Sequence, residues 1–147
     1  PEHEGYAAEL AATQASVKRM REAGIRVLVG GDYGLNITPH GTYAKELQYF
    51  TDYFGFSAGE ALQAATKHGG EAFMPDGSLG TLEAGKIADM VIVKGNPLEQ
   101  IGVLQDADAI AAVIKEGQIY AGLLENQSPH QKNAEQLNQL LGARPCN

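Results

Sequence analysis

Hydrophobic positions near the N-terminus follow the spacing of a helix and then of a strand. Residues 6–23 predict a helix with three apolar side chains on one face, and Gly24 supplies a stop signal. Those three residues are Leu10, Val17 and Met20. The consecutive apolar residues Val27–Val29 then predict a short strand that is buried on both faces, as in a parallel sheet. A helix, a short turn and a buried strand are half of an α/β repeat.

A second helical pattern follows a loop rich in turn residues. Residues 42–54 predict a helix that carries Leu47, Phe50 and Phe54 on one side. Ser57 and Glu60 form a capping box ahead of the next helix. That helix turns Ala58, Ala61, Leu62 and Ala65 inward, and we expect it to end at Gly69 and Gly70.

The pattern changes near Pro75, where β-branched runs replace the helical spacing. Met90–Val93 predicts one strand, and Ile110–Ile114 predicts another. The turn pair Glu116–Gly117 separates the latter from a third strand that begins at Gln118. These signals predict a small antiparallel β-subdomain.

The chain therefore divides into three parts. Residues 1–75 form a helix-rich segment, residues 76–124 supply the β-strands, and residues 125–147 are a polar tail. Ser128 and Pro129 make a helix start in that tail. A narrow apolar stripe follows, made of Ala134, Leu137, Leu140 and Leu141.

Composition and charge exclude several classes of function. The 147 residues carry a formal net charge of −7, which argues against a nucleic-acid partner. The single cysteine, Cys146, cannot form an intrachain disulfide or a thiolate metal cluster. No apolar run approaches the roughly 20 residues of a membrane span. Because the chain begins at Pro1 without a signal-peptide pattern, we expect a fragment of a larger cytoplasmic protein.

Asp32 is the one candidate for catalysis that the local pattern offers. It follows the predicted strand 27–29 and two glycines, and α/β folds place their chemistry at the carboxyl ends of strands. Glycines beside an acid also permit close approach by a ligand. An aspartate that caps a turn is the competing interpretation. His40 could bind substrate or a metal, or it could be a surface histidine.

The remaining histidines and glycines carry no catalytic signal. His68 lies near a helix C-terminus, where the dipole favours a cation, and His3 and His130 lie near the chain ends. There is no H-x-H or H-E-x-x-H motif. The cluster "GGDYG" lacks the spacing of a phosphate loop or a dinucleotide fingerprint.

Two stretches resemble the amidohydrolase superfamily of metal-dependent hydrolases. "LGTLEAGKIADMVIVKGNPL", residues 79–98, resembles the superfamily's C-terminal signature, which leads from the barrel to a small β-sandwich. "GGDYG…TPHGTYAKELQYF" and "EALQAATKHGGEAF" resemble the imidazolonepropionase-like and Xaa-Pro dipeptidase-like branch. The resemblance extends from about Ala11 to Tyr120.

The resemblance implies an α/β fold and a role for Asp32. The chain corresponds to the last part of a (β/α)8 barrel followed by sandwich strands, so the barrel in this chain is incomplete. Asp32 occupies the position of the acid that ends the eighth strand, where it ligates a metal and accepts a proton from the attacking water. Tyr33 and His40 then line the substrate side of the loop. Residues 79–98 are architectural, and Lys86 is a solvated turn residue.

The function implied is hydrolysis of a C–N bond in a small amide, cyclic amide or dipeptide-like substrate. A divalent metal, zinc by resemblance, belongs to the complete enzyme, whose other ligands are not in this sequence. We expect the chain alone to be inactive. The alternative is a catalytically silent module that self-associates through its uncovered barrel surface. A homo-oligomer, or association with the rest of the barrel, is the expected assembly.

Overall fold

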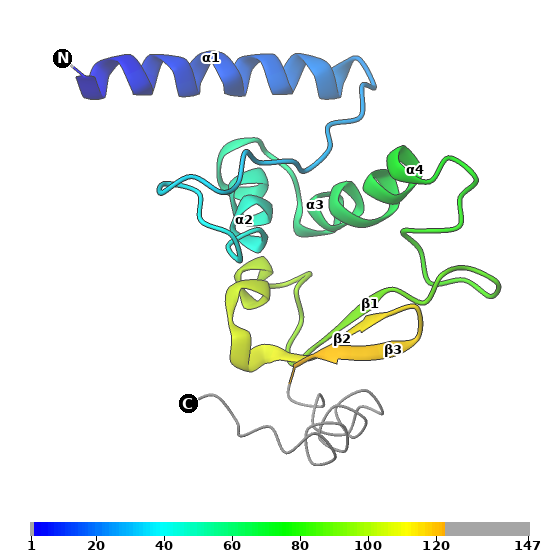
Figure 1. The fold of residues 1–147 in the computed structure, drawn as a ribbon. Helices are drawn as coiled ribbons and strands as arrows, with labels where there is room; N and C mark the ends of the chain where they lie inside the picture. The colour runs from blue at the N-terminus through cyan, green and yellow to red at the C-terminus, as the bar shows by residue number, and fades with distance from the viewer. Residues whose placement is uncertain (1, 123–147) are drawn as a thin grey trace.

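A computed structural model describes residues 2–122 and arranges them in layers (Figure 1). The long helix α1 lies above a group of shorter helices, and a three-stranded sheet lies below them. The helices are α1 (Glu2–Glu22), α2 (Ala44–Tyr53), α3 (Ala58–Gln63), a π-helical turn (Ala64–His68) and α4 (Gly69–Phe73). The strands are β1 (Met90–Val93), β2 (Ile110–Lys115) and β3 (Gln118–Ala121). Two 3₁₀ turns precede β2, at Ile101–Gln105 and Ala107–Ala109.

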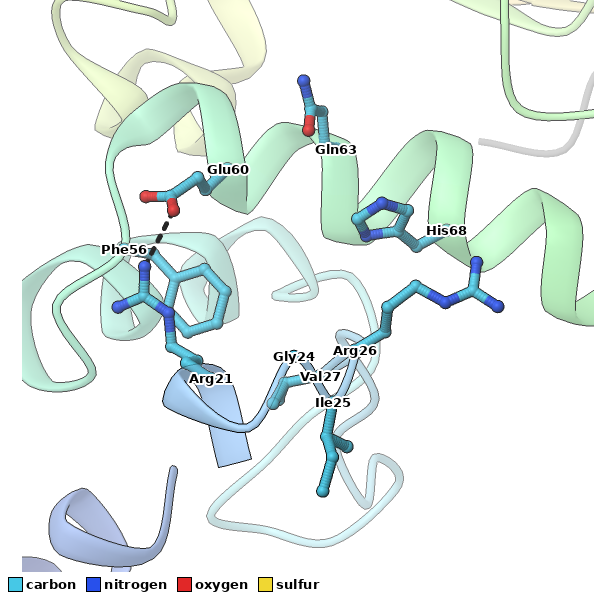
Figure 2. A pocket seen from close by; sticks show the side chains of 9 residues that line it. All are labelled: Arg21, Gly24, Ile25, Arg26, Val27, Phe56, Glu60, Gln63 and His68. Atoms are coloured by element: carbon cyan, nitrogen blue, oxygen red, sulfur yellow. Dashed lines mark hydrogen bonds and ion pairs between the residues drawn. The ribbon is translucent and has the colours of Figure 1, made fainter. Parts of the chain in front are cut away.

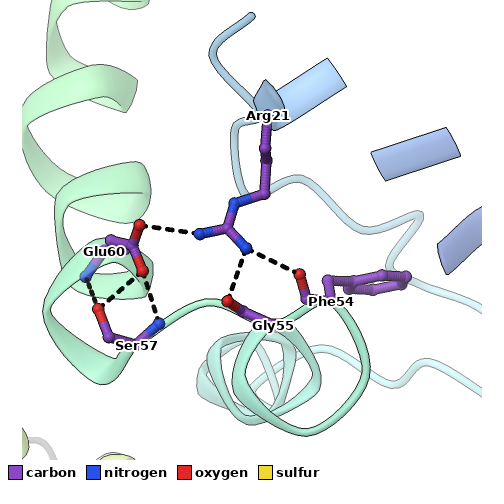
Figure 3. Close-up of polar contacts among 5 residues, drawn as sticks. All are labelled: Arg21, Phe54, Gly55, Ser57 and Glu60. Carbon is purple, nitrogen blue, oxygen red and sulfur yellow. Dashed lines mark hydrogen bonds and ion pairs between the residues drawn. The ribbon is translucent and has the colours of Figure 1, made fainter. Parts of the chain in front are cut away.

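Helix α1 is attached to the helices below it through its C-terminal half. Val17 is the buried member of its predicted apolar face, whereas Leu10 and Met20 stay partly exposed. The guanidinium of Arg21 donates to the carbonyl oxygens of Phe54 and Gly55, at 3.1 and 2.6 Å. It also pairs with Glu60 at 2.8 Å (Figure 3). Arg21 thus ties α1 to the link between α2 and α3, and Gln14 Nε2 adds a hydrogen bond to the Tyr53 carbonyl at 2.9 Å.

The core lies where α2, α3 and the first 3₁₀ turn meet. Its buried residues are Leu47, Phe50, Ala61, Ala64 and Ile101. The capping box at the start of α3 is confirmed, since Ser57 Oγ accepts the Glu60 N–H and the Glu60 carboxylate accepts the Ser57 N–H. Leu47 and Phe50 face the core as predicted. Ala64 is buried three residues after Ala61, whereas the predicted Ala65 is exposed because it lines an open groove between the helices and the sheet.

The predicted helix end at Gly69 and Gly70 is wrong, because α4 runs through both glycines to Phe73. The reason for glycine at position 70 is a close contact. A Cβ on Gly70 would lie 2.6 Å from the carbonyl oxygen of Leu79 and 2.7 Å from the Cα of Gly80. Gly70 therefore lets the chain after the helix cross directly over it.

The predicted buried strand at 27–29 is also not formed. The segment has no regular secondary structure, Leu28 is exposed, and Val27 and Val29 are half-buried against the core. A strand needs hydrogen-bonded neighbours, and the sheet among residues 2–122 contains only β1, β2 and β3. The apolar residues identified a packed segment, but they could not supply its partners.

The antiparallel β-subdomain is confirmed. The strand order is β1-β2-β3, with Met90 opposite Ile114 and Lys115 opposite Gln118. Glu116 and Gly117 both have positive φ, at 51° and 79°, as a two-residue hairpin turn requires. Lys86 is not solvated as expected: it is half-buried and bridges Thr81 and Glu83, so it closes the turn that precedes β1.

Two further sequence predictions concern a helix in the C-terminal tail and the lack of a membrane span. The helix predicted after Ser128 lies outside the described residues. Among the described residues, no helix combines the length and the apolar character that a membrane crossing needs.

Candidate active-site loop

Asp32 lies on an exposed loop directly after the extended segment 25–31. Thr38 Oγ1 donates to the Asp32 carbonyl oxygen at 2.5 Å. Gly34 N–H donates to the Thr38 carbonyl at 2.9 Å, and this bond closes the turn that follows. Within the described part of the chain, the Asp32 carboxylate has no hydrogen-bond or ion-pair partner. Its backbone is therefore held while its carboxylate is open to solvent.

Glu46 holds the residues on both sides of Asp32. Its Oε1 accepts the N–H of Gly30 at 3.0 Å, and its Oε2 accepts the hydroxyl of Tyr33 at 3.2 Å. Glu46 is in the first turn of α2, and its half-buried carboxylate is fixed by a core helix. Glu46 is not among the site residues predicted from the sequence. Its signal was an acid in the first helical turn after the loop, which is usually attributed to the helix dipole.

The three aromatic rings of this loop form one group. Tyr33 packs edge-on against Tyr43, with ring centroids 4.6 Å apart. His40 Nδ1 lies 2.8 Å from the Tyr43 hydroxyl, so the predicted substrate-side residues Tyr33 and His40 are linked through Tyr43. Burial raises the pKa of Tyr33 above its ordinary value of 10.0, and the negative charge of Glu46 raises the pKa further. Tyr33 thus stays a hydrogen-bond donor near neutral pH.

The described residues do not complete a metal site. A catalytic zinc site commonly uses three protein ligands. No group of three His, Cys, Asp or Glu side chains that could hold a metal is found among residues 5–122. The free carboxylate of Asp32 suits one ligand of such a site, and the remaining ligands would have to come from other residues.

A small pocket lies at the opposite end of the extended segment from Asp32. Its volume is about 260 Å³, and its lining includes Arg21, Arg26 and His68 (Figure 2). Both arginines are paired, Arg21 with Glu60 and Arg26 with Glu71. Because these charges are neutralised by their neighbours, we assign this pocket to the junction of the end of α1 and residues 24–27 with α3 and the π-helical turn.

Comparison with known proteins gives the class of the chain. The model of the amidohydrolase family matches residues 7–120. This chain therefore belongs to the amidohydrolase family. The relatives described below are hydrolases. Ochratoxinase of Aspergillus niger is 34% identical over 114 residues, which are 77% of this chain and 22% of that protein. Imidazolonepropionase of Symbiobacterium thermophilum is 31% identical over 108 residues, which are 74% of this chain and 25% of that protein.

Solved structures agree with this assignment. A Xaa-Pro dipeptidase with methionine bound in its active site is 35% identical, with a TM-score of 0.64 over 74% of this chain and 25% of that one. The crystal structure of A. niger ochratoxinase is 33% identical, with a TM-score of 0.64 over 78% of this chain and 25% of that one. The chain thus spans about a quarter of the length of the relatives that it matches.

Proposed function

We propose that this chain is the C-terminal portion of a metal-dependent amidohydrolase that hydrolyses a C–N bond. The substrate class is a small amide, a cyclic amide or a dipeptide-like molecule. The names of the relatives support this class, since they include an imidazolonepropionase and a Xaa-Pro dipeptidase. The observation that carries the proposal is the open carboxylate of Asp32 on a loop whose backbone is fixed by Thr38 and Glu46.

Asp32 has two roles in this proposal, as a metal ligand and as a proton acceptor. Asp32 would help to hold a divalent metal, zinc by family resemblance, and such a metal would supply a water with a pKa lowered to about 7. Asp32 takes a proton as the water oxygen bonds to the carbonyl carbon, and the proton passes to the leaving nitrogen when the C–N bond breaks. The segment 25–31 is then the eighth strand of a barrel, and its neighbours belong to the rest of the enzyme.

Tyr33 and His40 contribute to the substrate side of the loop. The Tyr33 hydroxyl is engaged by Glu46, so Tyr33 would meet substrate through its ring. His40 is exposed, and the Tyr43 hydroxyl fixes its orientation through Nδ1. The other ring nitrogen, Nε2, makes no hydrogen bond among the described residues and lies against Gly34, where a Cβ would be 3.1 Å away.

The substitution Asp32→Asn tests this function in a longer protein that contains the chain. We expect the variant to fold and to lose nearly all turnover of amide or Xaa-Pro dipeptide substrates, because an amide cannot accept the proton. Asp108→Asn is the control, since Asp108 is an exposed carboxylate in the 3₁₀ turn before β2. An Asp32→Asn enzyme with the turnover of the unsubstituted protein would refute the proposal.

A second function, self-association of a catalytically silent module, is favoured by one observation. A groove of about 1140 Å³ lies between the helices and the sheet, and most of its lining is apolar. Val91 and Val93 of β1 line one wall, while Leu47 and Leu62 line the other. Val91 is 53% exposed, and surfaces of this kind recruit partners. The occupant in this alternative is a second copy of the chain.

A further inference from the structure

We infer that Glu46 is a positioning residue that sets the place of Asp32 through the two residues that flank the Gly31–Asp32 pair. This inference rests on the proposed function of Asp32. Glu46 touches neither the carboxylate of Asp32 nor, in the proposed reaction, the substrate. It acts on the backbone before Asp32 and on the side chain after it.

The first observation is the division of the Glu46 carboxylate between two donors. One oxygen accepts the Gly30 N–H and the other accepts the Tyr33 hydroxyl, at 3.0 and 3.2 Å. Gly30 and Tyr33 are three residues apart, with Asp32 between them. One carboxylate therefore holds both ends of a segment of four residues. Hydrogen bonds to an ionised acceptor are stronger than bonds between neutral groups.

The second observation is that Gly31 fits this contact. A Cβ on Gly31 would lie 2.6 Å from Tyr33 Cε2 and 3.1 Å from Glu46 Oε2. Any larger residue at position 31 would push the ring or the carboxylate aside. The glycine before Asp32 is thus explained by the approach of Tyr33 and Glu46 to the backbone.

The third observation is that Glu46 belongs to a helix that packs into the core. Glu46 is one residue before Leu47, which is buried in the core, and both belong to α2. Tyr33 also packs against Tyr43, which immediately precedes α2. The position of the loop is therefore fixed by contacts with a packed helix and not by contacts with another loop. Small displacements of a catalytic group can cost on the order of a hundredfold in rate.

Two variants test the positioning role, each acting on the contact from a different side. Glu46→Gln removes one acceptor and the charge, and Gly31→Ala displaces Tyr33 and Glu46 without changing either. In the 147-residue chain, we expect faster hydrogen exchange of the Gly30 amide in Glu46→Gln. The control Glu99→Gln removes a charge at an exposed position elsewhere and should leave that exchange unchanged.

The kinetic readout uses a longer protein that contains the chain. Both variants should lower kcat by roughly tenfold to a hundredfold and change KM by less than about threefold, because positioning acts on the reacting groups. Glu99→Gln should retain full activity. An unchanged kcat in both variants, with Asp32→Asn inactive, would overturn the positioning role alone. Full activity in Asp32→Asn would instead overturn the proposed function.

Discussion

At the scale of single residues, the chain uses carboxylates for two different tasks. The Asp32 carboxylate is exposed and without a partner among the described residues, as a reactive group requires. Glu46 and Glu60 are instead occupied by hydrogen bonds from nearby backbone and side chains. Glu60 accepts from the Ser57 backbone and hydroxyl and pairs with Arg21 (Figure 3). Glu46 and Glu60 fix the chain, which leaves Asp32 available for chemistry.

Glu60 should make the stability of the chain depend on pH. The hydrogen bonds from Ser57, first from its backbone and then from its hydroxyl, hold the pKa of Glu60 below its ordinary value of 4.5. Because the folded state binds the proton less readily, this stabilisation is present above pH 4.5 and is lost as the pH falls through the lowered pKa. We expect Glu60→Gln to be less stable by up to about 1 kcal/mol at pH 7, since the group is largely exposed.

Urea unfolding at pH 7 and at pH 3 measures this effect. The difference between Glu60→Gln and the unsubstituted chain should shrink at the lower pH. Glu99→Gln, which changes an exposed carboxylate outside the capping box, should show no such trend. A stability difference for Glu60→Gln that is equal at both pH values would contradict the expectation.

At the scale of elements, the helix from Ala58 to Phe73 shows how two neighbouring glycines can have opposite meanings. Gly70 is buried under the backbone of Leu79 and Gly80. A Cβ on Gly69 would meet nothing closer than the Ala64 carbonyl oxygen, at an ordinary 3.5 Å. Glycine is required by packing at position 70, whereas at position 69 it only weakens the helix.

Alanine substitutions should therefore change the stability in opposite directions. Gly70→Ala forces backbone against backbone, and we expect a loss on the order of 2 kcal/mol. Gly69→Ala gains helix propensity and should stabilise the chain by up to about 1 kcal/mol. Thermal or urea unfolding of the two variants measures both effects, and each serves as the control for the other. Equal effects of the two substitutions would show that the close contact at Gly70 is absent in solution.

The elements that could be predicted from sequence are those with local signals. The capping box and the β2–β3 turn are set by residues within three or four positions of one another. The strand predicted at 27–29 failed because its hydrogen-bond partners are not among the described residues. Glu46 was missed because its donors at Gly30 and Tyr33 are 16 and 13 residues away, and no periodicity connects them. Local patterns identified Asp32 as a candidate. The residue that holds its neighbours, Glu46, became visible only in the structure.

At the scale of the whole molecule, the chain has a packed helical core beside apolar surfaces that are exposed to solvent. The segment that contains the predicted strand has no strand partner among residues 2–122, and the groove between helices and sheet is open and apolar. Both features fit a chain that spans about a quarter of its relatives. The complete active site in the proposed function is therefore a property of a longer protein.

Metal content and assembly state of the 147-residue chain should follow from this. With Asp32 as the one assigned ligand, we expect less than one equivalent of tightly bound zinc, because one carboxylate leaves the ion mostly hydrated. Elemental analysis after dialysis measures this, with the longer protein as the positive control. Sedimentation on the same samples tests the self-association alternative. In that alternative the 147-residue chain is a dimer, whereas the longer protein does not dimerise through the groove. Stoichiometric zinc in a monomeric short chain would contradict both expectations.

The attachment of α1 through Arg21 has a mechanical consequence. The helix has 21 residues and is about 30 Å long, and residues 5–13 are exposed. A tension applied to α1 from its N-terminal side would first load the buried Val17 and the hydrogen bond from Gln14 Nε2 to the Tyr53 carbonyl, and then the Arg21 guanidinium. The carbonyls of Phe54 and Gly55 and the carboxylate of Glu60 would share that load. Gln14 and Arg21 are thus the points at which a pull on α1 would be transmitted to the end of α2 and to the link that orients α2 against α3.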